Sequence, residues 1–296
     1  MAPLVVITPA QVLDTRAPRD FSLYPRKFLA AGDSWFSIGA LNLAKQSNLL
    51  YEMEFSSTCA VVHCGSPGDS PSRLDDRARD PCFMALLTGR QARRWDGLLI
   101  SGGGNDLILA LGTTPIGTPP RQRLLLTQPE WGDAGLGTDR YISEDGWAAF
   151  ATYIRANLDD LIKLRDSGIN HGVPIFMHTY AYLTPRHAPA VRGTKAWVAP
   201  ALHDHGIPPA DWTATCHNLQ GRLADLLLAC AGDQRRYPNL HVFDTTTVPL
   251  LPASPSSTGE SGDWMNETHL AWRGYEKLAL PWARGIEAVL QRAAPV

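Results

Sequence analysis

The sequence predicts an α/β protein in which helices cover a parallel sheet. Short apolar runs alternate along the chain with longer amphipathic ones, the pattern of parallel strands connected by helices. Polar or glycine-rich residues follow each short run, which is typical of the carboxyl ends of strands where α/β ligand sites form. The 296 residues can bury a large core, and without an internal repeat or linker we expect one domain over residues 1–296.

The individual elements follow from these patterns. Five apolar runs are expected to be strands: residues 27–31, 60–63, 97–101, 174–179 and 240–244. Three stretches with one apolar face are expected to be helices: residues 147–165, 212–231 and 274–292. Gly168 is a plausible stop for the first helix, and Pro281 is expected to bend or interrupt the third. The segments 112–145 and 181–211, rich in Pro, Gly and aromatic residues, are long loop insertions that we expect to be functional covers, with decoration or oligomer contact as the alternative.

Composition excludes several classes of function. The net charge is −2 and no basic stripe is found, so a nucleic-acid partner is not expected. No segment approaches the ~18 apolar residues that span a bilayer. The amino terminus has no basic start, and its apolar run is broken by Pro9. This pattern differs from that of a signal peptide, so we expect a cytoplasmic protein. The five cysteines lack CxxC spacing, so neither a disulfide framework nor a structural zinc site is expected; a homo-oligomer is left open.

Four short blocks carry chemically capable residues. "FLAAGDSWFSIG" places Ser34 after an apolar run, a position that alone also fits a helix N-cap. "VVHCGSPGDSPSRL" contains Gly68, where backbone can approach a ligand closely. "LLISGGGNDLIL" places the Asn105 amide at a strand's carboxyl end, and "DWMNETHLAWRGYEKLA" places His269 before the last helix.

In this order the blocks resemble those of the SGNH (GDSL-type) hydrolases, a family named for its Ser, Gly, Asn and His. The resemblance runs from residue 27 to about residue 279; Trp35 stands where Leu is common, and His63 where Asn is usual. It implies a three-layer α/β/α fold with a flavodoxin-like parallel sheet of about five strands. It also implies a serine esterase that needs neither a metal nor an organic cofactor and acts on a small-molecule ester.

The resemblance assigns a role to each block residue. Ser34 is the expected nucleophile and His269 the base that activates it. The backbone N–H groups of Ser34 and Gly68 and the side chain of Asn105 are the expected oxyanion donors. His178 follows another predicted strand and could line the substrate pocket or be a hydrogen-bonded structural residue.

The residue behind the histidine departs from the family pattern. The family usually has Asp three residues before the histidine, and here that residue is Asn266. Asp263 is favoured, because a carboxylate stabilises an imidazolium better than an amide does. Asn266, Glu267 and a bare Ser–His dyad are the alternatives.

The expected function is hydrolysis of carboxylic esters through an acyl-serine intermediate. The aromatic-rich insertions favour an acyl or aryl ester. Lysophospholipase, thioesterase and carbohydrate acetylesterase activities are the alternatives within this class. A non-catalytic binding protein with a decayed hydrolase site is the alternative from another class.

Overall fold

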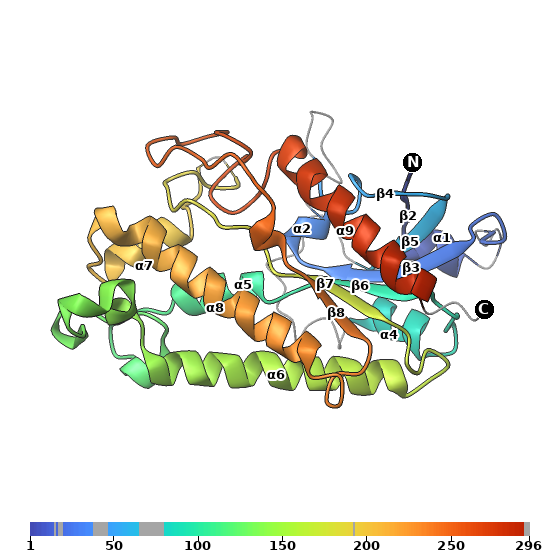
Figure 1. Ribbon diagram of the computed structural model, residues 1–296, viewed down its shortest axis with the longest axis horizontal. Helices are drawn as coiled ribbons and strands as arrows, with labels where there is room; N and C mark the ends of the chain where they lie inside the picture. The colour runs from blue at the N-terminus through green and yellow to red at the C-terminus, as the bar shows by residue number, and fades with distance from the viewer. Residues whose placement is uncertain (15, 17–19, 38–46, 65–79, 192, 293–296) are drawn as a thin grey trace.

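The centre of the molecule is a parallel sheet of six strands. The computed structural model describes residues 1–14, 16, 20–37, 47–64, 80–191 and 193–292. The sheet has the order β2-β5-β3-β6-β7-β8, and all neighbouring pairs are parallel (Figure 1). Its strands are β2 (Val5–Ile7), β3 (Arg26–Gly32), β5 (Cys59–His63), β6 (Gly97–Ser101), β7 (Ile175–His178) and β8 (Leu240–Phe243). A separate antiparallel pair is formed by β1 (Ala2–Pro3) and β4 (Glu54–Phe55).

The five expected strands are all confirmed, and β2 is a sixth that the sequence pattern did not reveal. Its three residues pair with β5 at the edge of the sheet, in the register Val5↔Ala60, and so short a run carries little periodicity. The other five strands have the order β5-β3-β6-β7-β8, which is the 2-1-3-4-5 order of flavodoxin-like folds. The predicted fold class is therefore confirmed.

The three expected long helices are present. The helices are α1 (Pro9–Leu13), α2 (Ser34–Ser37), α4 (Pro81–Leu87), α5 (Gly104–Leu111), α6 (Glu144–Asp166), α7 (Val198–Asp204), α8 (Trp212–Gly232) and α9 (Trp272–Arg292). α6 ends two residues before Gly168. Pro281 does not interrupt α9, because buried Leu278 and Trp282 on either side hold the helix against the core despite the missing hydrogen bond.

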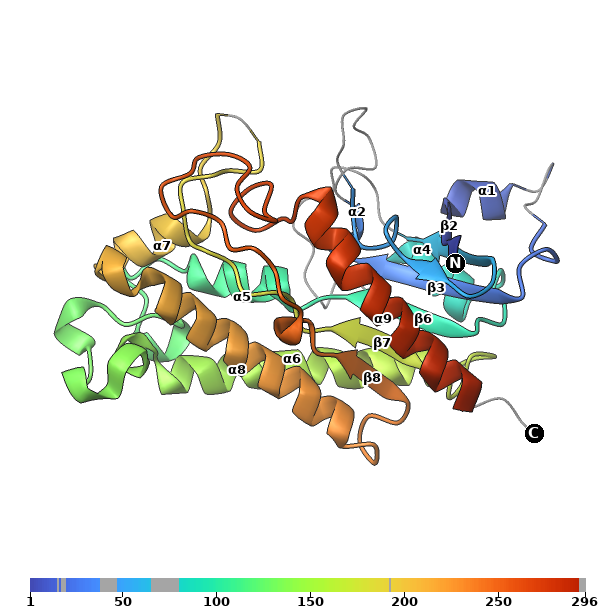
Figure 2. The same cartoon turned by 45° about the horizontal axis from the view of Figure 1, so that its top comes forward.

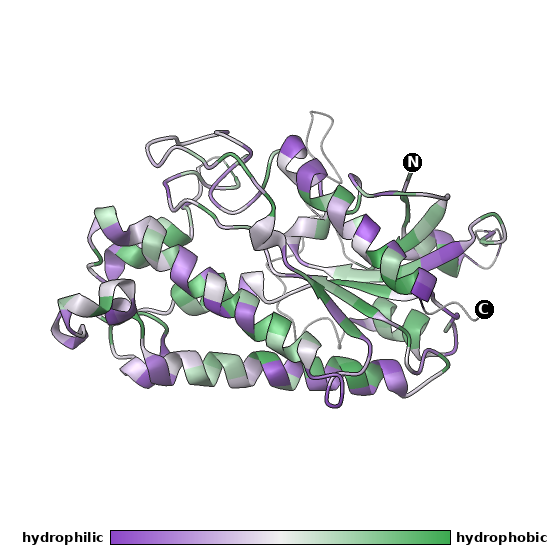
Figure 3. Cartoon of the chain, in the orientation of Figure 1, coloured by the Kyte–Doolittle hydropathy of each residue, from purple (hydrophilic) through white to green (hydrophobic). Residues whose placement is uncertain are grey.

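Helices cover both faces of the sheet. α2 and α9 lie on one face, where Phe36 and Trp282 stack with their ring centroids 5.9 Å apart (Figures 1 and 2). α4, α6 and α8 lie on the other face; Asn170, after α6, donates a 2.8 Å hydrogen bond to the carbonyl of Leu87 at the end of α4. The strands are largely hydrophobic and the helices mixed in character, as a sheet buried on both faces requires (Figure 3).

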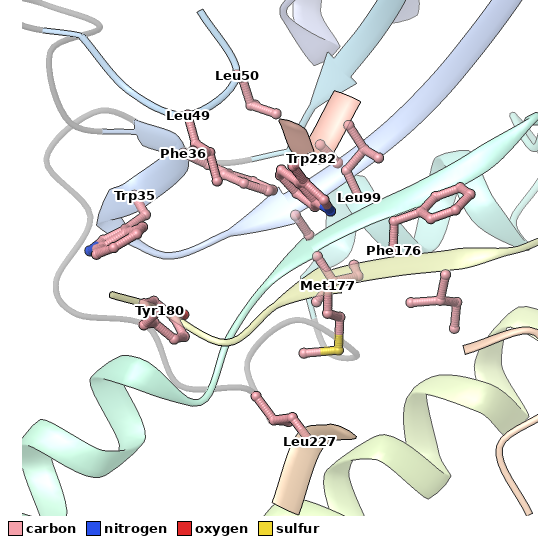
Figure 4. Close-up of a cluster of buried hydrophobic side chains, with 14 of the residues drawn as sticks. Trp35, Phe36, Leu49, Leu50, Leu99, Phe176, Met177, Tyr180, Leu227 and Trp282 are labelled. Atoms are coloured by element: carbon pink, nitrogen blue, oxygen red, sulfur yellow. The ribbon is translucent and has the colours of Figure 1, made fainter. Parts of the chain in front are cut away.

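Aromatic packing fixes the short helix α2 above the carboxyl ends of the central strands. Trp35 and Phe36 of α2 lie in a buried cluster with Met177 of β7 and Trp282 of α9 (Figure 4). The chain can turn so tightly before α2 because residue 32 is glycine. A Cβ atom there would lie 2.3 Å from the Phe36 ring.

The two insertions contain short helices. Residues 112–145 form the 3₁₀ turns η1 (Pro120–Gln122), η2 (Gln128–Glu130) and η3 (Ala134–Tyr141), and residues 181–211 contain α7 and η4 (Pro209–Asp211). The Tyr141 hydroxyl donates a 2.5 Å hydrogen bond to Asp211, joining the two segments. Within the described ranges, none of the helices is long and apolar enough to cross a membrane.

Candidate active site

Ser34 lies where the topology of the sheet favours a ligand site. It is the first residue of α2 and follows β3, whose neighbours are β5 on one side and β6 on the other. The chain leaves β3 for one side of the sheet and later returns to the other, so the carboxyl end of β3 is the switch point at which α/β folds bind ligands. Ser34 is half-buried there.

His269 reaches Ser34 from the far end of the chain. Its Nε2 lies 2.7 Å from the Ser34 Oγ, and the ring is buried. The indole N–H of Trp35 donates a 3.1 Å hydrogen bond to the carbonyl of Thr268. Trp35, which follows Ser34, and Thr268, which precedes His269, are thus joined by a direct hydrogen bond.

Asn266 stands behind the imidazole. Its Oδ1 accepts the backbone N–H groups of Thr268 and His269, both at 2.9 Å, and lies 3.1 Å from the His269 Nδ1. A backbone N–H group can only donate a hydrogen bond. The side-chain atom of Asn266 that faces this turn must therefore be its oxygen and not its nitrogen. The Nδ1 then carries the ring proton and donates to Asn266, which leaves Nε2 as the acceptor for the Ser34 hydroxyl.

The imidazole is held neutral. Burial lowers the pKa of His269 to about 4. Its hydrogen-bond partners are the hydroxyl groups of Ser34 and Thr268 and the amide of Asn266, none of which carries a charge that would raise the pKa. The ring is therefore available as a base at neutral and mildly acidic pH.

The other two candidates for the third position are bonded elsewhere. The Asp263 carboxylate accepts the N–H of Leu251 at 2.7 Å and pairs with the Lys277 ammonium at 2.6 Å. This differs from the sequence-based preference for Asp263: its carboxylate has no hydrogen bond to His269 among the described contacts, because the turn directs it toward α9 and Lys277.

Glu267 caps a helix. Its fully buried carboxylate accepts the backbone N–H groups of Arg186 and of residues 197–199, at 2.7–3.1 Å. These bonds satisfy free N–H groups at the start of α7. Burial raises the pKa of Glu267, and its hydrogen bonds oppose the rise.

Of the two further oxyanion candidates, the structure describes one. Asn105 lies in the first turn of α5 and lines the same cavity as Ser34 and His269. Gly68 lies within residues 65–79, outside the described residues.

An apolar cavity leads away from the Ser34–His269 pair. α5 contributes the apolar side chains of Leu107, Ile108 and Leu111, and the second insertion contributes Ala181, Leu183 and Val198. Besides Ser34 and His269, the other lining residues are Trp35, Gly104, Asn105, Thr179, Tyr180, Cys216, Gln220, Leu223, Trp264 and Thr268. The insertion 181–211 therefore forms part of the cavity wall, whereas the first insertion contributes none of the described lining residues.

A buried polar network lies beneath Ser34, and the sequence did not point to it. The Asp33 carboxylate accepts the Ser101 hydroxyl at 2.7 Å and also the Tyr180 hydroxyl. His178 Nε2 lies 3.0 Å from the Ser101 Oγ, and burial lowers the pKa of His178 to about 3. Of the two interpretations of His178, the hydrogen-bonded structural one fits its position. Asp33 is part of the first block, but spacing alone did not indicate its partners.

The histidines and acidic residues do not assemble into a metal site in the described part of the chain. There, no group of three or more His, Cys, Asp or Glu side chains is placed to hold an ion.

Comparisons with known proteins give only distant matches, all to solved structures. No protein-family model and no curated protein matches the chain. An extracellular lipase from Streptomyces rimosus aligns at 17% identity over 88% of this chain and 99% of that one, with a TM-score of 0.49. A phospholipase A1 from Streptomyces albidoflavus aligns at 12% identity over 88% and 98%, with a TM-score of 0.47. A carbohydrate acetylesterase from Sinorhizobium meliloti aligns at 12% identity over 89% and 99%, with a TM-score of 0.43.

At these identities and TM-scores the alignments identify no activity and no substrate. The strand order of the sheet defines the class: an α/β/α fold of flavodoxin-like order, as the resemblance to SGNH hydrolases implies.

Proposed function

We propose that this protein is a serine esterase of the SGNH type that cleaves carboxylic esters through an acyl-Ser34 intermediate. The observation that carries the proposal is the chain of contacts from Ser34 Oγ to His269 Nε2, at 2.7 Å, and from His269 Nδ1 to Asn266 Oδ1, at 3.1 Å. A nucleophile bonded to a base that a third group orients is the signature of covalent catalysis. A helix cap requires neither of these contacts.

Acylation follows from this geometry. As Ser34 Oγ attacks the ester carbonyl, its proton passes to His269 Nε2, and the carbonyl oxygen becomes an oxyanion. The Ser34 backbone N–H and the Asn105 side chain are the donors proposed to stabilise that charge, together with Gly68 as the resemblance implies. His269 then gives its proton to the departing alcohol, leaving the acyl group on Ser34. Water activated by the same ring releases the acid.

Asn266 serves here as the third member of a Ser–His–Asn triad. Its amide oxygen holds the ring with the proton on Nδ1 and gives the imidazolium a polar but uncharged partner. A carboxylate would stabilise that cation more strongly. The amide instead leaves the resting imidazole neutral at lower pH, in agreement with the lowered pKa of His269.

The cavity supports an ester with an apolar acyl or aryl group. Its apolar lining continues along α5 from Asn105, which shares the cavity with Ser34, to Leu111. With a rise of 1.5 Å per residue, the six residue steps from Asn105 to Leu111 span about 9 Å along the helix axis. An acetyl group would leave most of that wall uncovered, so we propose acyl chains longer than acetyl.

The test is hydrolysis of a chromogenic ester series graded by acyl length, with Ser34→Ala as the blank. The proposal predicts activity that depends on Ser34 and rises from acetyl toward longer chains. Activity confined to acetyl esters would contradict the proposed acyl chains longer than acetyl, and would indicate sugar or aryl acetates as the substrates instead. No Ser34-dependent hydrolysis across the series would favour the non-catalytic binding protein.

A further inference from the structure

Tyr180 connects the two sides of the proposed oxyanion site. Its hydroxyl donates to the carboxylate of Asp33, the residue directly before Ser34. Its ring packs on Gly104, the residue directly before Asn105; a Cβ at Gly104 would lie 2.6 Å from two ring atoms. One side chain thus touches the neighbours of two proposed oxyanion donors, which lie on different strand–helix connections.

The Asp33 carboxylate organises the first of these connections. Its Oδ1 accepts the Trp35 N–H at 3.0 Å and the Ser101 hydroxyl at 2.7 Å, and its Oδ2 accepts the Tyr180 hydroxyl. These bonds come from α2, from β6 and from the segment that follows β7. They hold the backbone on both sides of Ser34, and therefore the direction of the Ser34 N–H.

Ser101 extends the network to His178. Its single hydroxyl proton is used toward Asp33, so its oxygen is the acceptor for the His178 Nε2–H at 3.0 Å. Because burial lowers the pKa of His178 to about 3, this ring stays neutral and adds no charge beneath the nucleophile. The donors that hold the Asp33 carboxylate, the Trp35 N–H and the hydroxyl groups of Ser101 and Tyr180, are thus all uncharged.

The backbone of Tyr180 is held in an unfavourable conformation. Its φ is +68°, in the left-handed region that a bulky residue rarely enters because the conformation is strained. The conformation places the ring beside Trp35 (Figure 4), with centroids 5.0 Å apart. Tyr180 also lines the cavity. Strain of this kind collects where a side chain must be held in one place.

We propose that Tyr180 is a positioning residue of the oxyanion site. Through its contacts with Asp33 and Gly104 it fixes the position of the Ser34 N–H relative to the Asn105 side chain. The proposal rests on the proposed esterase function. It assigns Tyr180 an effect on the transition state, in which both donors must face one oxygen, and little effect on binding of the ground-state ester.

The first test is Tyr180→Phe, which keeps the ring on Gly104 and removes the hydroxyl that donates to Asp33 and lies 3.2 Å from the Ser101 Oγ. We expect kcat for the best chromogenic ester to fall about 10- to 30-fold with KM changed less than about twofold, because small misplacements of donors lower the rate and not the affinity. Tyr275→Phe is the matched control: this buried tyrosine also packs on Trp35, but its hydroxyl has no hydrogen bond to Asp33. The control should keep wild-type kcat.

A double-mutant cycle with Asn105→Ala separates positioning from a general loss of stability. If Tyr180 acts through the donors, Tyr180→Phe should cost less than about threefold once the Asn105 amide is gone. Full additivity of the two losses, or a wild-type kcat in Tyr180→Phe, would overturn the inference while leaving the esterase proposal intact. Absence of Ser34-dependent hydrolysis in the wild type would instead remove the esterase proposal, and the inference with it.

Discussion

The Asn266 side chain accepts the Nδ1 proton of His269 at 3.1 Å while two backbone N–H groups of the same turn hold its oxygen in place. An amide therefore occupies the position at which a carboxylate is usual. The charge of the group behind the base differs from that of an Asp triad, although the geometry is kept. This difference has measurable consequences.

Replacing Asn266 with Asp should change the pH dependence of the reaction. The substitution keeps the accepting oxygen and adds a negative charge beside the ring, which favours the imidazolium and raises the pKa of His269 above about 4. The acid limb of kcat/KM should move up by at least about one pH unit, and the rate at pH 8 should not fall. An unchanged acid limb would show that residue 266 does not face the charge on the ring.

Asn266→Ala should lower kcat/KM at every pH, because the ring loses its orienting partner.

Asp263→Asn should leave catalysis intact and weaken the fold. The carboxylate of Asp263 pairs with Lys277 and accepts the Leu251 N–H, so its loss removes one partly buried ion pair. We expect a thermal midpoint lowered by a few degrees, corresponding to about 1 kcal/mol, with kcat/KM unchanged. A large loss of kcat in a folded Asp263→Asn variant would restore this residue as the partner of His269.

Activity and stability should respond differently to acid. Burial holds the pKa of His269 at about 4 and that of His178 at about 3, below the ~6.5 of an exposed imidazole. Between about pH 6.5 and 4 the unfolded chain binds protons that the folded protein does not, so stability falls as the pH is lowered through this window. The neutral base, however, should keep kcat/KM nearly constant down to about pH 5. Parallel pH series of kcat/KM and thermal midpoint test this, and an acid limb near pH 6.5 would contradict it. Exposed His203→Gln is the control and should leave the stability series unchanged.

Glu267→Gln should destabilise the cover of the site. The buried carboxylate accepts four backbone N–H groups, from Arg186 and residues 197–199. A glutamine would replace one accepting oxygen with an NH₂ group, which can only donate and would face these N–H groups. We expect the free energy of unfolding to fall by about 2 kcal/mol in chemical denaturation. Exposed Glu260→Gln is the control and should be neutral. If the Glu267 variant instead kept full stability and shifted the acid limb of kcat/KM, Glu267 would act on His269 rather than on α7.

Leu111→Phe should shorten the preferred acyl chain. Leu111 lies on α5 at the end of the apolar wall away from Asn105, and a larger side chain there narrows the cavity without touching Ser34. Hydrolysis of long-chain esters should fall about 10-fold or more, with acetyl ester hydrolysis within about twofold of wild type. Leu109→Phe, on the same helix but facing the hollow on its other side, is the matched control. Equal losses for all chain lengths would show that the acyl group does not lie along α5.

Most of the fold could be predicted from the sequence, because its central strands are continuous apolar runs that each end in polar or glycine-rich residues. β2 could not, since its three residues pair only with β5 and carry no pattern of their own. α9 continues through Pro281 because it packs against the core. This packing outweighs the tendency of a proline to interrupt a helix.

The site could be predicted only in part. The blocks pointed to Ser34, Asn105 and His269, and the structure brings all three to one cavity. The choice among Asp263, Asn266 and Glu267 depended on which way each side chain leaves one tight turn, and spacing along the chain does not contain that direction. The position of Tyr180 depends on a positive φ and on contacts across three strands, which a sequence pattern does not reveal.

The central claim is that Ser34 is an activated nucleophile, and covalent labelling tests it most directly. The protein is treated with a fluorophosphonate probe at neutral pH, and its mass and the modified peptide are then determined, with Ser34→Ala treated in parallel. The proposed triad predicts a single adduct on Ser34 of the wild type and none on the variant. A wild-type protein that stays unlabelled, or a Ser34→Ala variant that labels equally, would contradict it.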